Sequence, residues 1–212
     1  MHYNPDIHHR HSIRLKGYDY SQAGMYFVTI SVQNKECLFG KIQNETMILN
    51  NAGTMIKRWY FELSNKFPDI VCGNCIVMPN HFHCIIINTG NDDASVGANL
   101  CVRPDECVRP DECVRPDECV RPDDHVINKG EHIHQGEHIG SPLRTIIQWF
   151  KTMTTNEYIR GVKNAGWEPF DKKMWQRNYY EHIIRNEQSY QHISDYITNN
   201  PRKWVNDKFY TV

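Results

Sequence analysis

Two apolar runs joined by a Pro-Asn dipeptide constrain the fold of this chain more than any other feature. Residues 69–78 (DIVCGNCIVM) and 81–88 (HFHCIIIN) are short and rich in β-branched side chains. The two residues between them, Pro79-Asn80, allow only a tight connection, so the runs predict neighbouring antiparallel strands. Side chains alternate along a strand, which places the first and third residues of His-Phe-His on one face and the phenylalanine on the other, in the core.

The remaining ordered segments predict an α+β fold. Strand-like runs of β-branched and aromatic residues occupy 25–32 and part of 173–185, and helical spacing of apolar residues occupies 50–67, 141–161 and 186–200. The order strand, helix, strand, strand, helix, strand predicts a ferredoxin-like βαββαβ antiparallel sheet with helices on one face. One more helix follows.

Start and stop signals bound the two later helices. Ser141-Pro142 predicts an N-cap followed by proline at the first helical position, and Gly161 predicts the end of that helix. Asn186 is the predicted N-cap of the last helix, and Pro201 its stop.

A hexapeptide repeat interrupts this pattern. Residues 101–124 read CVRPDE three times and then CVRPDD. A period of six fits neither helix nor strand, and every unit contains a proline. We interpret 89–140 as a low-complexity, disordered insertion between two parts of one domain, 1–88 and 141–212. The alternative is a Cys/His metal-binding tract, for which the repeat offers ligands but no scaffold.

The net charge of −1 conceals an uneven distribution. The insertion 89–140 holds 5 of the 24 basic and 12 of the 25 acidic residues, a net charge of −7. The remainder therefore holds 19 basic and 13 acidic residues, a net charge of +6. A basic body favours a nucleic-acid partner more than the whole-chain charge does, although many soluble domains are as basic.

The chain has no stretch that approaches the roughly 20 uninterrupted apolar residues of a membrane span. Its polar, His-rich start, MHYNPDIHHRHSIRLKG, lacks the apolar segment of a signal peptide. We therefore expect a cytoplasmic protein that does not insert in a membrane and whose cysteines are reduced. Cys72 and Cys75 form a CxxC, which indicates either a zinc or redox site or two small residues in a buried strand.

His81 and His83 are candidate metal ligands. Two imidazoles on one face of a strand can bind one divalent cation when a third ligand comes from elsewhere in the fold. Many His-x-His pairs are ordinary surface or core residues, and that alternative stays open. An otherwise apolar strand favours the metal site, because buried polar rings need partners.

Tyr196 and Asn200 are four residues apart in the last helix and share a face. A tyrosine beside a divalent ion can act as a nucleophile, and an amide oxygen one turn later can bind the same ion. The alternative is that Tyr196 packs with Ile193 and Ile197 in the apolar stripe of the helix.

Four segments carry a resemblance to a known family. MPNHFHCIIIN resembles the histidine motif of the HUH endonucleases. Together with RLKGYDYSQAGMYFVTI, WQRNYYEHIIRNEQSY and YITNNPRKW, it resembles the REP-associated tyrosine transposases, relatives of the single-tyrosine insertion-sequence transposases. The resemblance covers about 10–88 and 141–208, that is, all but the insertion.

The resemblance implies a mobile-element enzyme for DNA transposition and recombination, with a ferredoxin-like catalytic domain at 1–88 and 141–212. It implies His81, His83 and Asn200 as ligands of a divalent ion, Mg²⁺ or Mn²⁺, and Tyr196 as the catalytic nucleophile. Tyr196 would attack a DNA phosphodiester to form a 5′-phosphotyrosine and release a 3′-OH, and no organic cofactor is needed.

The implied partner is single-stranded or hairpin DNA, of the type formed by repetitive extragenic palindromes, and the oligomeric state, monomer or dimer, stays open. Basic contacts and stacking aromatic rings hold single strands. The candidate DNA contacts are Arg10, Arg14, Lys16, Tyr18, Arg177, His182, Arg185, Arg202 and Lys203. Each can equally be an ordinary solvated side chain.

Two alternative functions remain open. One is another HUH nuclease, such as a plasmid relaxase or a replication initiator, which would share the metal motif but not the flanking segments. The other is a domesticated hairpin-DNA-binding protein that has lost catalysis, which the intact set of candidate catalytic residues disfavours.

We predict that deletion of residues 95–138 leaves a folded protein. A disordered loop contributes little to a core, and changes in loop length cost only about 0.6 kcal/mol per doubling. Thermal unfolding of the deletion variant checks this. Loss of the cooperative transition, or strong amide protection of the segment in the full chain, would contradict the prediction.

Overall fold

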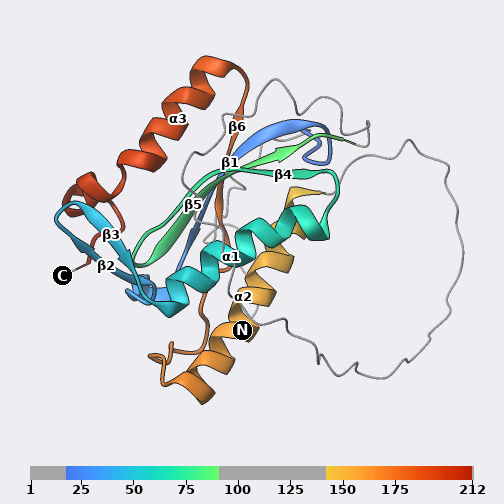
Figure 1. Cartoon of the computed structure of the whole chain (residues 1–212). Helices are drawn as coiled ribbons and strands as arrows, with labels where there is room; N and C mark the ends of the chain where they lie inside the picture. The colour runs from blue at the N-terminus through green and yellow to red at the C-terminus, as the bar shows by residue number, and fades with distance from the viewer. Residues whose placement is uncertain (1–17, 91–141, 212) are drawn as a thin grey trace, which may run out of the picture. The chain divides into compact units, whose positions relative to one another are not determined.

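The computed structural model describes residues 18–90 and 142–211, and Figure 1 shows their arrangement. Four strands form one antiparallel sheet with the spatial order β4-β5-β1-β6. The strands are β1 (Gly24–Ser31), β4 (Ile70–Val77), β5 (His81–Asn88) and β6 (Tyr180–Ile184). The helices are α1 (Asn51–Lys66), α2 (Leu143–Ala165) and α3 (Glu187–Asn199). The predicted α+β order of strands and helices is confirmed.

The connection between β4 and β5 is as tight as the sequence predicts. The amide of Met78 donates to the carbonyl of His81 across it at 2.8 Å. Phe39 and Val32 donate from outside to the carbonyls of Pro79 and Asn80. Burying any of these backbone amide or carbonyl groups without a partner would be costly. The three hydrogen bonds therefore fix the position at which β5 begins.

The helices α1 and α2 cover one face of the sheet. Phe82 of β5 is fully buried there and stacks on Phe150 of α2, with ring centroids 5.4 Å apart. Ile56 and Tyr60 of α1 complete the contact, and burial of each such side chain contributes about 1.5–3 kcal/mol. The predicted direction of Phe82 into the core is therefore confirmed.

The helix α3 covers the other face. Ile193 and Ile197 of α3 pack against Phe27 of β1, Ile85 of β5 and Ile184 of β6 in a second, smaller apolar cluster. The N-cap of α3 is Asn186, as predicted, and its side chain accepts a hydrogen bond from the Ser189 amide at 2.8 Å. Pro201 ends α3, and the chain continues in the 3-10 helix η3 (Pro201–Asn206).

A second small sheet was not predicted from the sequence. Its strands are β2 (Gly40–Gln43) and β3 (Thr46–Leu49), which pair in a hairpin. Asn44 and Glu45 at its tip have φ values of 50° and 60°, as a two-residue hairpin turn requires. Each strand has only four residues, and none of these residues is fully buried. The alternation of apolar and polar residues is therefore too short to predict a strand from the sequence.

The end of α2 differs from the prediction. The helix does not stop at Gly161 but runs to Ala165, and Gly166 with φ 67° ends it. The start also shifts by one residue, since Pro142 is the N-cap rather than the first helical residue. Gly161 instead lies against the indole of Trp167, where any side chain would collide. A close helix–ring contact, not a helix stop, explains that glycine.

From the sequence, we interpret residues 89–140 as a disordered insertion. Of these residues the structure describes only Thr89 and Gly90, and the others lie outside the described residues. The first described residue of this segment stays close to the sheet, because the amide of Thr89 donates to the carbonyl of Asp69 at 2.8 Å. Within 18–90 and 142–211, no helix combines the length and apolar character needed to cross a membrane.

We predict that Gly161→Ala lowers the free energy of unfolding by about 1–3 kcal/mol, because the added methyl group forces the Trp167 ring out of its place. Chemical denaturation measures the loss. Asn164→Ala, on the exposed side of the same helical turn, is the matched control and should change stability by less than about 0.5 kcal/mol. Equal stability of both variants would contradict the close contact.

Candidate functional site

The strand β5 presents two histidines on the face that α3 covers. His81 is 0% and His83 is 1% exposed. Thr29 of β1 lies opposite His83, and Tyr180 of β6 lies opposite Thr29 on its other side. A row of side chains on one face therefore runs from His83 through Thr29 to Tyr180.

Asn80 fixes the orientation and the tautomer of His81. The Asn80 Nδ2 group donates to the carbonyls of Lys35 and Phe209 at 3.0 and 2.8 Å. Its Oδ1 atom consequently faces His81 Nδ1, 2.9 Å away, and accepts a hydrogen bond from it. With the proton on Nδ1, the lone pair of His81 lies on Nε2.

The second ring is held in the same way. The hydroxyl of Thr29 lies 2.8 Å from His83 Nδ1, and it can accept the proton of that atom. The Nε2 atoms of His81 and His83 then face each other at 3.0 Å. Two ligand atoms about 2.1 Å from one cation and at right angles to each other are also about 3.0 Å apart. The pair therefore fits a single divalent ion.

Burial keeps both rings uncharged. It lowers the pKa of His81 to about 2, with a contribution from the nearby His83 and Lys208. It lowers the pKa of His83 to about 3, and the charge of Lys208 acts in the same direction. Neutral imidazoles offer their lone pairs to a cation at pH 7 without first losing a proton.

Two further oxygen atoms that could bind a metal ion belong to Asn200, at the end of α3, and to Asp207, which follows η3. A carboxylate oxygen of Asp207 and the ring nitrogens of His81 and His83 all lie within 4.8 Å of one another. Asn200 is 1% exposed, and its buried Oδ1 atom has no hydrogen-bond partner among residues 18–90 and 142–211. A buried amide oxygen without a donor is costly, and a bound cation would satisfy it. A hard cation with mixed nitrogen and oxygen ligands fits this set.

Tyr196 lies against the same histidine. Its hydroxyl is 3.5 Å from His83 Nε2, the two rings meet edge to face at 5.3 Å, and 36% of the residue is exposed. Burial raises the pKa of the phenol, the charge of Asp207 raises it further, and a hydrogen bond from the Asn200 amide lowers it. A phenol at this point is reachable from solvent and needs a cation to become a phenolate.

The end of the chain forms one wall of the site. The Phe209 ring lies 4.4 Å from the His81 ring, and the Trp204 ring stacks on His81 at 6.0 Å. The carbonyl of Phe209 is tied to Asn80, and the amide of Phe209 is tied to the Asp207 carboxylate at 2.8 Å.

Comparison with known proteins identifies the relatives of this chain. An uncharacterised protein of Haemophilus influenzae is 39% identical over 208 residues, which are 98% of this chain and 97% of the relative. The chain belongs to the family of that protein. No family model matches the chain.

Two solved structures are similar to this chain at low sequence identity. A REP-associated tyrosine transposase bound to a REP hairpin superposes with a TM-score of 0.48 at 18% identity, over 90% of this chain and 73% of that one. A candidate transposase of Deinococcus radiodurans superposes with a TM-score of 0.39 at 12% identity, over 88% of this chain and 95% of that one.

The predicted site residues His81, His83, Tyr196 and Asn200 come together as described, whereas the predicted DNA contacts are scattered. Tyr18 packs against the larger apolar core, on the sheet face that α1 and α2 cover, and this is the face opposite the histidines. Its hydroxyl lies 3.5 Å from the hydroxyl of Tyr26. His182 is exposed on the face of the histidines, one row from Tyr180. The other described candidates, all exposed, are Arg177, Arg185, Arg202 and Lys203. Arg10, Arg14 and Lys16 lie outside the described residues.

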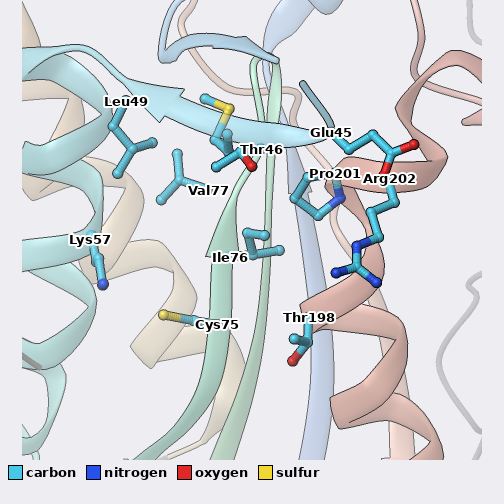
Figure 2. Close-up of a pocket in the computed structure, with 11 residues that line it drawn as sticks. Glu45, Thr46, Leu49, Lys57, Cys75, Ile76, Val77, Thr198, Pro201 and Arg202 are labelled. Carbon is cyan, nitrogen blue, oxygen red and sulfur yellow. The ribbon is translucent and has the colours of Figure 1, made fainter. Parts of the chain in front are cut away.

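A groove of about 410 Å³ opens along β4, and Figure 2 shows its lining. Ile76 in its wall is the register partner of His83. Arg202 lines it from η3 and Lys57 from α1. Glu45 and two threonines line it as well, so the groove carries charges of both signs on a mixed polar and apolar wall.

The CxxC of Cys72 and Cys75 lies in β4 next to a bulge. Across 18–90 and 142–211, the one group of three or more metal-ligating His, Cys, Asp or Glu side chains is His81, His83 and Asp207. The interpretation of the CxxC as part of a strand therefore fits the described structure better than a zinc site.

Asp207 and Lys208 were missed by the sequence analysis. They follow a 3-10 helix, in a segment without helical or strand spacing. The only sequence feature that links them to the site is their position, seven and eight residues after Asn200. That position indicates proximity to the site only when the turn at Pro201 is known.

We predict that acid destabilises the metal-free protein through the histidine pair. Unfolded imidazoles bind protons near pH 6.5, but His81 and His83 in the folded state do so only near pH 2 and 3. The unfolded state therefore binds more protons between these values, and each histidine lowers the free energy of unfolding by up to about 1.4 kcal/mol per pH unit below pH 6.5.

Urea denaturation between pH 4 and pH 8 measures this slope, and His81→Gln or His83→Gln should reduce it. If the variants and the wild type gave parallel curves, another group would cause the acid sensitivity.

Proposed function

We propose that this protein is a metal-dependent tyrosine transposase of the HUH type, which cleaves and rejoins single-stranded, hairpin-forming DNA. One observation carries the proposal. The Tyr196 hydroxyl lies 3.5 Å from His83 Nε2, the same atom that faces His81 Nε2 at 3.0 Å. A nucleophile directly beside a pair of neutral imidazole ligands is the arrangement that metal-assisted phosphodiester cleavage needs.

Sequence motifs support the same class. The four segments that resemble the REP-associated tyrosine transposases contribute His81 and His83 from β5, and Tyr196 and Asn200 from α3. The histidine pair and the Tyr196–Asn200 pair are separated by more than 100 positions in the chain, yet they meet at one point of the fold.

The metal would be held by His81, His83 and Asp207, with the Asn200 oxygen as a further ligand. When bound, Mg²⁺ or Mn²⁺ supplies Lewis-acid polarisation of the scissile phosphate. The protein supplies the orientation of the ligands, through the hydrogen bonds of Asn80 and Thr29 to the two rings.

Tyr196 supplies the nucleophile. The bond from its phenolic oxygen to phosphorus forms as the bond from phosphorus to the 3′-oxygen breaks, which leaves a 5′-phosphotyrosine and a free 3′-OH. The phenol proton passes to water, which reaches the half-buried ring, and the leaving oxygen takes a proton from water. Attack by the 3′-OH of a second strand reverses the step and rejoins the DNA without ATP.

Asn200 positions and activates the nucleophile. Its amide group hydrogen-bonds the Tyr196 oxygen and lowers the pKa of the phenol, against the effects of burial and of Asp207. A donor to the phenolate stabilises the reactive form, so this contact should matter more for the rate than for DNA binding.

We predict that Tyr196→Phe abolishes formation of a covalent protein–DNA adduct but retains hairpin binding, because it removes only the attacking oxygen. The assay incubates the protein with a hairpin oligonucleotide that carries single-stranded flanks and Mn²⁺, followed by denaturing electrophoresis. The matched controls Tyr179→Phe, Tyr180→Phe and Tyr190→Phe should all form the adduct, and a chelator should prevent it in every case.

Peptide mapping of the adduct gives the decisive result. A nucleotide on any tyrosine other than Tyr196 would contradict the assignment. Hairpin binding by the wild type without any adduct would favour a DNA-binding protein that lacks catalysis, and absence of binding would overturn the proposed substrate.

A further inference from the structure

We propose that the Lys208 ammonium group binds the scissile phosphate and stabilises the charge that accumulates on it as Tyr196 attacks. This inference rests on the proposed function and assigns a catalytic residue outside the ligand set and the nucleophile. It is carried by the position of Lys208 and by the way the fold holds it.

The Lys208 Nζ atom lies over the row of side chains that contains His83. It is 5.6 Å from the ring centroid of Tyr180 and 4.9 Å from that of Phe209. Tyr180 is the register neighbour of Thr29, whose hydroxyl touches His83, and the Phe209 ring lies 4.4 Å from that of His81. The two rings that hold the ammonium thus flank the two histidines.

The backbone around Lys208 is fixed to the same residues that orient the site. The Lys208 carbonyl accepts a hydrogen bond from Lys35 Nζ at 2.7 Å, and the next carbonyl, of Phe209, accepts one from Asn80. Asn80 is also the partner of His81. These bonds fix the backbone that carries the exposed Lys208 side chain, and the two ring contacts place its ammonium group near the histidines. A cation placed in advance where charge develops is the condition for effective electrostatic catalysis.

The charge of Lys208 is not neutralised within the described structure. Of the residues 18–90 and 142–211, no carboxylate forms an ion pair with the Lys208 ammonium, although Asp207 precedes it in the chain. A divalent ion on the histidines would add like charge nearby. A phosphodiester between the ion and the ammonium would be attracted to both, because each carries positive charge.

Tyr180 completes the environment of the bound nucleotide. Its ring is 45% exposed although it lies in the sheet, one row position from Thr29, and it packs edge to face on Phe27. Its aromatic face holds the ammonium by a cation–π contact that phenylalanine can also make.

The test combines a protein variant with a modified DNA. After the cleaved linkage has been mapped with the wild type, that linkage is replaced by a neutral methylphosphonate, in which a methyl group replaces one non-bridging oxygen. Adduct formation is then measured for the wild type and Lys208→Met on both DNAs. Lys163→Met, at the exposed end of α2 and on the other side of the sheet, is the matched control.

We expect Lys208→Met to slow adduct formation on natural DNA by about 10²-fold, as loss of one transition-state contact does. We expect the neutral linkage to slow the wild type strongly but Lys208→Met by no more than about 3-fold, because the two changes remove one shared contact. Lys208→Arg should recover part of the rate, and Lys208→Gln serves as a second neutral variant. If the two losses multiplied, or if Lys208→Met were as fast as Lys163→Met, the inference would be overturned.

A binding measurement separates this inference from the proposed function. In the Tyr196→Phe background, without a divalent ion, Lys208→Met should reduce the slope of log Kd against log salt for the hairpin by about 1, the effect of one phosphate contact. An unchanged slope would count against the contact. Failure of the wild type to form any adduct would overturn the proposed function, while the slope would still decide whether Lys208 binds phosphate.

Discussion

Two uncharged imidazoles buried side by side are the constraint on which the rest of this site depends. His81 and His83 share a face of β5, with 3.0 Å between their Nε2 atoms. Burial of two polar rings in a sheet is tolerated only because Asn80 and Thr29 satisfy their outer nitrogens. The inner nitrogens are left facing each other, and that arrangement is stable where a cation can bind between them.

The segment after α3 connects this pair to the rest of the molecule. Pro201 ends the helix and turns the chain back over the histidines, so that Asn200, Asp207 and Lys208 reach the same point from three positions in the chain. The segment brings an amide, a carboxylate and an ammonium to one centre. If a cation and a polyanionic strand bind there, as we propose, the charges of the protein and of the strand balance around the ion.

Sequence patterns predicted most of the elements and half of the site. Alternation in 81–88 was enough to put His81 and His83 together, and four-residue spacing was enough to pair Tyr196 with Asn200. The hairpin of β2 and β3 was missed because four-residue strands carry little periodicity. The end of α2 was misplaced because a glycine that allows a ring contact has the same appearance in a sequence as one that ends a helix.

The sequence by itself determined which residues share a face, since this follows from the period of each element. Only the tertiary structure decided which faces meet. It brought Tyr196 of α3 to within 3.5 Å of His83, and it added Asp207 and Lys208 from a segment without any periodic pattern. The physical reason is that distances between elements depend on how α3 packs on Phe27 and Ile85 and on where the chain turns at its end, and neither is encoded in local spacing.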